Sequence, residues 1–233
     1  MNIPDTVLKT SIIKQSIKDG EYTGWDDVRT GTVRAMKRRG IRPEAIRRYW
    51  VESGIKPVDI EFSWQNLYGM NRDIIDTDAN RYFYVENPVS YDIDGVDIIE
   101  GAAPKHPDHP ERGERKFKLD APRTVFLAQA DSEMFEKDKK IRLKDLCNIE
   151  YGKPAKYIGN DVSILKTGVR AVQWVASDGL EATLVMPDGS VQTGKIEPDI
   201  SAENNDMVQL ERIGFVRIEK KDPKSVSMIF SHR

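Results

Sequence analysis

Apolar residues at helical spacing dominate the first third of the chain. Between residues 11 and 19 the apolar positions are isoleucines, and Gly20 follows them as a natural C-terminal stop. Residues 30–39 form a second such segment, with Gly40 just past its end. Both segments are predicted to be helices that bury one side.

Two further helices have recognisable starts. Pro43 suits a first helical position, Glu44 complements the helix dipole there, and the apolar face runs as far as Gly54. Ser63 provides a cap for the last helix, in which the side chains that share one face lie between residues 64 and 75.

After about residue 79 the pattern changes to the alternation typical of β-strands. Strands are predicted at residues 82–85, 89–93, 96–99, 124–128, 141–149, 172–176, 180–186, 191–196, 208–219 and 226–230. Asp-Gly pairs after residues 93, 177 and 187 indicate turns, the first of them a hairpin turn. Many short strands separated by such turns favour barrels or a sandwich, since closed barrels remove exposed edges. Residues 102–116 are the one long irregular segment.

Composition limits the class of protein without identifying it. The chain has 233 residues, of which 39% are hydrophobic and 32% charged, and this describes one large or two modest globular domains. No apolar run approaches the roughly 20 residues of a membrane helix, and the start lacks the apolar core of a secretory signal. The single Cys147 excludes an intrachain disulfide and favours a reducing, cytoplasmic setting. We expect it to be a half-buried strand residue.

Positive charge is concentrated near the N-terminus. Residues 1–72 contain 13 Lys and Arg against 9 Asp and Glu, whereas the remainder contains 23 against 29. Eight cations lie between Arg29 and Arg48, where Glu44 is the one acid. Such a patch is typical of polyanion binding, and the alternative is a solvated helix face.

The motifs of most enzyme classes are absent from the sequence. It has no phosphate-binding Gly-rich loop, no nucleophile elbow and no paired metal-ligand spacing. His106 and His109 lie among prolines without a third ligand nearby, so we expect no metal site and no catalytic residue. Basic residues combined with Gln, Asn and aromatics instead suit RNA, whose unpaired bases are recognised by hydrogen bonds and stacking.

Several motifs in order resemble one family. GWDDVRTGTVRAMKRRGIRPEAIR is similar to a segment of the glutamyl-tRNA synthetases of archaeal and eukaryotic type and of their relatives, the glutaminyl-tRNA synthetases. The resemblance continues through SWQNLYGMNRDIIDTDANRYFYVENPV, HPERGER, DSEMFEKDKKIRLKDLCNIEYG and VQLERIGFVRIEKKD. It therefore covers nearly the whole chain, and it favours the glutamyl over the glutaminyl group.

The resemblance implies an α+β fold and a place within a larger ligase. A helical connector at residues 1–75 would precede two mainly antiparallel β-barrels that bind the anticodon. The proximal barrel would take residues 76–119 and 199–233, and the distal barrel residues 120–198. The family's nucleotide-binding domain, with its His-Ile-Gly-His motif, has no counterpart here, so this chain alone is expected to be inactive and to bind no cofactor. ATP and Mg²⁺ would be used by the full-length ligase.

The resemblance also assigns roles to particular residues. Recognition of the anticodon falls to Arg81, Gln209 and Arg212 for the middle base, and to Arg142 and Lys144 for a flanking base. The RNA backbone would be bound by Arg34, Lys37, Arg38, Arg39, Arg42, Arg47 and Arg48 of the connector, and by Arg112, Arg115 and Lys116. For an arginine of HPERGER, a contact with a barrel carboxylate is the alternative. A remnant of the family's second ATP-binding loop would be Lys9, Thr10 and Ser11.

The expected partner is a tRNA that accepts glutamate, bound by a monomer that needs no membrane. Four alternatives remain open from the sequence. They are a fragment of a glutaminyl-tRNA synthetase, a helix-turn-helix regulator using the turn at Gly40, a non-catalytic RNA- or protein-interaction module, and catalysis by this chain alone.

Overall fold

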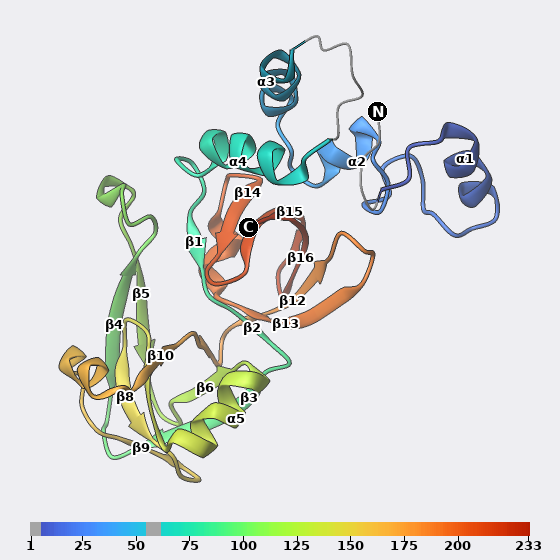
Figure 1. Cartoon of the computed structure of the whole chain (residues 1–233). Coiled ribbons are helices and arrows are strands. Elements are labelled where there is room, and N and C mark those ends of the chain that lie inside the picture. Colours follow the sequence, from blue (N-terminus) through green and yellow to red (C-terminus); the bar gives the residue numbers. More distant parts are fainter. Residues whose placement is uncertain (1–5, 55–61) are drawn as a thin grey trace.

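A computed structural model describes residues 6–54 and 62–233 of the chain. Its helical part consists of α1 (Thr10–Lys18), α2 (Val33–Arg38), α3 (Pro43–Ser53) and α4 (Trp64–Ile75). The predicted starts are confirmed, since Pro43 occupies the first turn of α3 and the Ser63 hydroxyl accepts from the Asn66 N–H at 3.2 Å. In Figure 1 α4 lies across the upper end of a curved sheet, with α3 beyond it.

The first sheet has seven strands and curls into a nearly closed barrel. In spatial order they are β1 (Arg81–Tyr82), β14 (Met207–Leu210), β15 (Gly214–Asp222), β16 (Ser225–His232), β12 (Leu180–Val185), β13 (Val191–Ile196) and β2 (Tyr84–Glu86). The edge strands β1 and β2 are consecutive in the chain, and Phe83 alone separates them. The two edges of the sheet therefore come together at one residue.

The second sheet also has seven strands and forms a half-barrel. In order they are β10 (Arg170–Val172), β7 (Lys140–Leu143), β8 (Cys147–Glu150), β9 (Ala155–Tyr157), β3 (Val89–Asp94), β6 (Thr124–Leu127) and β11 (Val175–Ala176). Pairing is mainly antiparallel in both sheets, so the expected fold class is confirmed. The helix α5 (Gln129–Asp138) covers this sheet, and the sequence analysis did not predict it.

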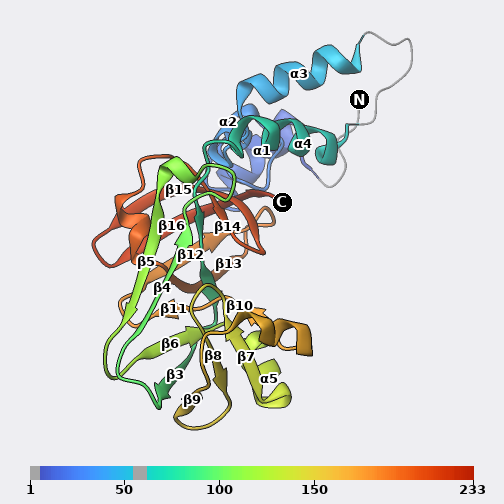
Figure 2. The same cartoon turned by 90° about the vertical axis from the view of Figure 1, so that its left-hand side faces the viewer.

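A long two-stranded hairpin, here called the arm, extends alongside both sheets. It consists of β4 (Ile99–Pro104) and β5 (Glu114–Leu119), with a short 3₁₀ helix, η1 (Pro110–Arg112), at its tip. Figure 2 shows the arm running past both sheets. The expected irregular segment 102–116 therefore includes parts of two strands. Two other 3₁₀ helices are η2 (Val162–Thr167) and η3 (Pro198–Ala202).

The pairing partners of β3 correct the hairpin expected at Asp94 and Gly95. The chain bends at Gly95, whose N–H bonds to the Asp94 carboxylate at 2.8 Å. However, β3 pairs with β6 and β9, and β4 pairs with β5. Tyr91 and Ile93 of β3 pack in the core of the second sheet. The chain after Gly95 therefore leads into the arm and does not pair with β3.

Strand membership also differs from the expected barrel ranges. The β12–β13 hairpin falls within 120–198, yet β12 pairs with β16 and β13 with β2, all in the first sheet. Its Leu184 and Ile196 pack there against Val208 and Met228. Conversely, β3 was expected in the proximal barrel and belongs to the second sheet. The second sheet thus takes all its strands from the continuous stretch 89–176.

The helical part is fixed to the first sheet at the turn after α2. Gly40 has φ +83°, and an added Cβ there would collide with the Met207 side chain of β14. The Arg42 N–H donates to Asn71 Oδ1 at 2.7 Å, and Asn71 is fully buried. The turn between α2 and α3 is therefore packed against β14 and α4.

Candidate nucleic-acid interface

Arg81 and Gln209, far apart in the sequence, lie side by side. Parallel pairing of β1 with β14 makes them direct Cα partners. Each side chain has a buried polar atom without a hydrogen-bond partner, namely Nε of Arg81 and Oε1 of Gln209. One Nη of Arg81 lies 3.8 Å from Asp76 Oδ1, and 26% of the arginine side chain is exposed. An unpartnered donor and an unpartnered acceptor thus lie on neighbouring strands, which is unusual for buried polar atoms.

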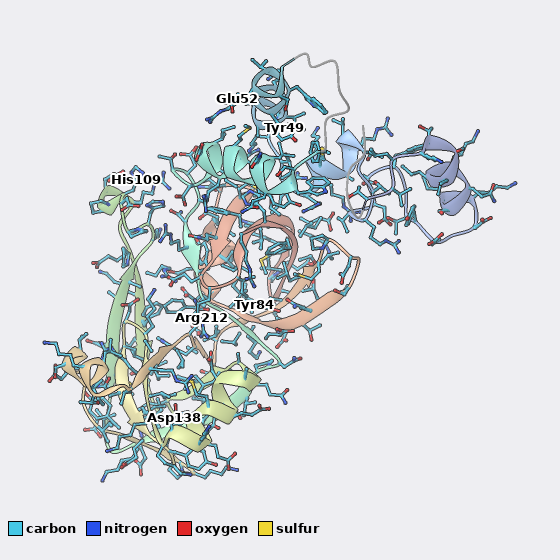
Figure 3. The ribbon with its side chains drawn as sticks, viewed as in Figure 1. Tyr49, Glu52, Tyr84, His109, Asp138 and Arg212 are labelled. Carbon is cyan, nitrogen blue, oxygen red and sulfur yellow. The ribbon has the colours of Figure 1, made fainter. Side chains whose placement is uncertain are left out.

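Arg212 lies in the turn between β14 and β15 and points towards α5. Its Nη1 donates to Asp131 Oδ2 at 2.8 Å and its Nη2 to Asp131 Oδ1 at 3.3 Å. More than half of the side chain, 57%, is exposed. Figure 3 shows Arg212 at the junction between the two sheets. The structure therefore pairs Arg81 with Gln209 directly, whereas Arg212 is oriented by a different element.

A buried ionic cluster joins the arm to both sheets. Arg115 is 1% exposed, and its guanidinium pairs with Glu197 and, at 3.4 Å, with Glu211. The second oxygen of Glu211 pairs with Lys144. Arg115 also lies 4.7 Å from the centre of the Phe83 ring. Arg115 is therefore inaccessible to a phosphate, and its contacts match the alternative, an arginine held by carboxylates of the fold.

Burial raises the pKa of Glu197 to about 7, although Arg115 and the Phe83 N–H act in the opposite direction. Because the folded pKa lies above its ordinary value, this carboxyl adds stability that is present at low pH and lost as pH rises through 7. As pH rises from 4.5 to 7, the free energy of unfolding of Glu197→Gln should increase relative to that of the wild type by up to about 3 kcal/mol. Urea unfolding of both proteins across this range tests it, and parallel curves would contradict it.

Arg142 and Lys144 do not form a common pocket. Arg142 is 8% exposed, and its Nη1 donates to Asn148 Oδ1 at 2.9 Å and to the Asn160 carbonyl at 3.0 Å. Lys144 lies just beyond the end of β7, is 40% exposed and binds Glu211. The two residues predicted to contact one flanking base therefore have separate partners in the structure. Arg142 orders the loop after β9.

The connector cations fall into three groups. Arg34 and Lys37 are exposed on α2, and neither forms an ion pair with any residue in 6–54 or 62–233. Four others are paired at 3.0 Å or less: Arg38 with Glu219, Arg42 with Asp206, Arg47 with Glu44, and Arg48 with Glu52. Such partly exposed pairs contribute little to stability, so a phosphate can replace the carboxylate at small cost.

Arg39 is the exception, and its expected phosphate contact is corrected. The residue is 5% exposed. One Nη donates to the Tyr68 hydroxyl at 2.7 Å and to the Ser231 carbonyl at 2.8 Å. Its guanidinium also lies 5.4 Å from the centre of the Trp64 ring. Arg39 therefore fastens α4 to β16, and its burial leaves it inaccessible to a phosphate.

The remaining predicted cations differ in accessibility. Arg112, at the tip of the arm, binds the Thr77 carbonyl and pairs with Asp78 at 3.4 Å, so it fixes the arm to the segment after α4. Lys116 is exposed on β5. Lys9, Thr10 and Ser11 are exposed where α1 begins. Their expected ligands stay predictions.

Two features of the site were not predicted from the sequence: the carboxylates that pair with the arginines, and an aromatic cleft. Asp131, Glu197 and Glu211 orient the arginines. Asp131 and Glu211 had a signal, since they lie inside the DSEMFEK and QLER motifs, and Glu197 had none. The cleft, of about 880 Å³, is lined by α4, the turn after β14, and residues of β2, β13 and β16. In it Trp64 stacks on Tyr68, with ring centres 5.5 Å apart.

Two further properties limit the kinds of site. Within residues 6–54 and 62–233, no three His, Cys, Asp or Glu side chains are grouped to bind a metal ion. None of the helices in that part of the chain is both long and apolar enough to span a membrane.

Cys147 is fully buried rather than half-buried, and burial raises the pKa of its thiol to about 12.

Comparison with known proteins identifies the two sheets. Residues 79–167 and 171–219 match two family models, each described as an anticodon-binding domain of class I tRNA synthetases (E and Q). The whole chain is 41% identical to the glutamate–tRNA ligase of Thermococcus onnurineus and 41% identical to that of Methanocaldococcus jannaschii. It covers 42% and 43% of these two proteins. The chain thus spans about two fifths of the length of the curated relatives it matches.

Proposed function

The chain belongs to the class I tRNA synthetases for glutamate and glutamine through their anticodon-binding domains, and on that premise we propose that it is the C-terminal, tRNA-binding portion of a glutamate–tRNA ligase. Glutamate is favoured over glutamine because the relatives described above are glutamate–tRNA ligases. The complete ligase would use ATP and Mg²⁺ in a catalytic domain, and Lys9, Thr10 and Ser11 would face that domain. The expected setting is the cytoplasm.

The pair formed by Arg81 and Gln209 carries the proposal. A uracil base offers an N3–H donor flanked by two carbonyl acceptors. Both atoms are buried without a partner in the chain. With the two side chains turned towards a base, Oε1 of Gln209 would accept the N3–H, and the Nε–H of Arg81 would donate to a neighbouring carbonyl. Glutamate and glutamine anticodons share uridine at the middle position, so a uracil site here would serve the expected anticodon.

Cations at the helical end would bind the RNA backbone. Arg34 and Lys37 are exposed without ion pairs inside the described ranges, and Arg38, Arg42, Arg47 and Arg48 are paired only at the surface. Phosphate contacts of this kind position an RNA without recognising its sequence. Lys116 on the arm would add a further contact.

The packing of Gly40 disfavours the helix-turn-helix alternative. A DNA-recognition helix must present its N-terminal residues to a groove. Here the turn before α3 is pressed against Met207, and Arg42 at the start of α3 is bonded to Asn71 and Asp206. The start of α3 is therefore occupied by contacts within the chain.

Titration at fixed salt tests the proposal. The chain should bind a glutamate tRNA transcript about tenfold more tightly than the same transcript with its central anticodon uridine replaced. Gln209→Leu should abolish most of this preference, because leucine cannot accept the N3–H. Gln15→Leu, on the exposed face of α1, is the matched control and should retain it. Equal binding of both transcripts by the wild type would contradict base recognition, and binding of neither would favour a protein-interaction module.

A further inference from the structure

Arg212 is held in place from its backbone to its guanidinium. The turn from Leu210 to Gly214 is closed by the Ile213 N–H, which donates to the Leu210 carbonyl at 3.1 Å. Arg212 itself has φ +66°, a left-handed conformation that residues other than glycine adopt at a cost. The direction in which its side chain leaves the turn is therefore fixed by the backbone.

Asp131 fixes the other end of the same side chain. It lies in the first turn of α5, and 11% of its side chain is exposed. Both of its carboxylate oxygens accept from the Arg212 guanidinium, at 2.8 and 3.3 Å. Two parallel bonds of this kind determine the plane of a guanidinium, which one bond does not. Asp131 thus orients Arg212 from α5, the helix that covers the second sheet.

The oriented guanidinium retains free donors at an open position. A guanidinium has five N–H groups, of which Asp131 engages two, and the side chain is 57% exposed. Arg212 lines the aromatic cleft of about 880 Å³ on one side and a hollow of about 500 Å³ beside α5 on the other. Its remaining N–H groups are therefore accessible to a ligand in either space.

We propose that Asp131 is a positioning residue for base recognition by Arg212, a role that rests on the proposed anticodon function. A guanidinium only donates, so in a fixed orientation it favours a base edge with carbonyl acceptors over one with amino donors. Without the clamp the flexible side chain would donate to bases or phosphates alike. Asp131 would thereby convert a general RNA contact into a selective one.

The test compares Asp131→Asn with a charge-matched control. Removing any acid near RNA strengthens binding in general, so the informative quantity is the preference for the native transcript over the one with its central uridine replaced. We expect Asp131→Asn to reduce that preference by about threefold to tenfold. Glu133→Gln removes the same charge from the same hollow without touching Arg212, and should leave the preference unchanged.

A double-mutant cycle separates positioning from a loss of structure. If Asp131 acts through Arg212, the change in preference caused by Asp131→Asn should disappear in an Arg212→Ala background. A merely structural role would produce the same change in both backgrounds and would overturn the proposal, as would an unchanged preference in Asp131→Asn. If Arg212→Ala itself leaves the preference intact, then base recognition by Arg212 fails, and this failure is distinguishable from that of the clamp.

Discussion

Arg115→Met should lower the free energy of unfolding at pH 8 by about 3–5 kcal/mol, because it leaves Glu197 buried without its cation. Arg115 is 1% exposed and the Glu197 side chain 5%, so water cannot replace the lost contact. Methionine fills part of the space but donates nothing to either Glu197 or Glu211. The loss should be smaller at pH 5, where the raised pKa of Glu197 keeps its carboxyl protonated.

Urea unfolding at the two pH values measures this effect. Lys116→Met is the control, because Lys116 is the exposed neighbour on the same strand and should change stability by less than about 0.5 kcal/mol. Adding Glu197→Gln to Arg115→Met should recover part of the loss by removing the orphaned charge. Equal stability of Arg115→Met and Lys116→Met would show that the cluster does not contribute to the fold.

The second large effect concerns Arg39, which the family resemblance had placed among the phosphate contacts. Arg39→Met should cost about 2–3 kcal/mol of unfolding free energy, because the Tyr68 hydroxyl and the Ser231 carbonyl both lose their donor. The stacked contact with Trp64 is lost as well. The measurement is again urea unfolding, followed by tRNA titration of the fraction that remains folded.

Lys37→Met provides the contrast two residues away. Lys37 is exposed and forms no ion pair with a described residue, so its replacement should leave stability unchanged. It should weaken the binding of all tRNAs alike. It should also reduce, by about one, the slope of the logarithm of the binding constant against the logarithm of salt concentration. The opposite assignment, with Lys37 needed for stability and Arg39 needed only for binding, would contradict the buried and exposed roles given to the two residues.

Local chemistry predicted the helices better than it predicted their surroundings. Pro43 and Ser63 start α3 and α4 because capping depends only on nearby backbone groups. The bend at Asp94 and Gly95 was also recognisable, but the partner of the strand after it depends on core packing far along the chain. The helix α5 was missed because its buried face includes Asp131 and Ser132, so apolar periodicity gives little signal.

The candidate site shows the same division. The family resemblance assigned a common role to Arg81 and Gln209, and the parallel pairing of their strands places these two residues side by side. It did not indicate that Arg39, Arg115 and Arg142 are buried, since positive charge in a sequence does not specify which carboxylates and carbonyls surround it. Distinguishing a cation that faces RNA from one that fastens two strands requires the tertiary contacts.

The continuous origin of the second sheet has an evolutionary consequence. All its strands come from residues 89–176, while the strands that precede and follow this stretch, β2 and β12, both pair with β13. The points where the stretch leaves and rejoins the first sheet are therefore near each other. A module attached through two adjacent points can be lengthened, trimmed or exchanged between lineages without rebuilding its host, because the host barrel closes on its own strands. Selection could thus remodel one part of the anticodon-facing surface while the pair at β1 and β14 stays as it is.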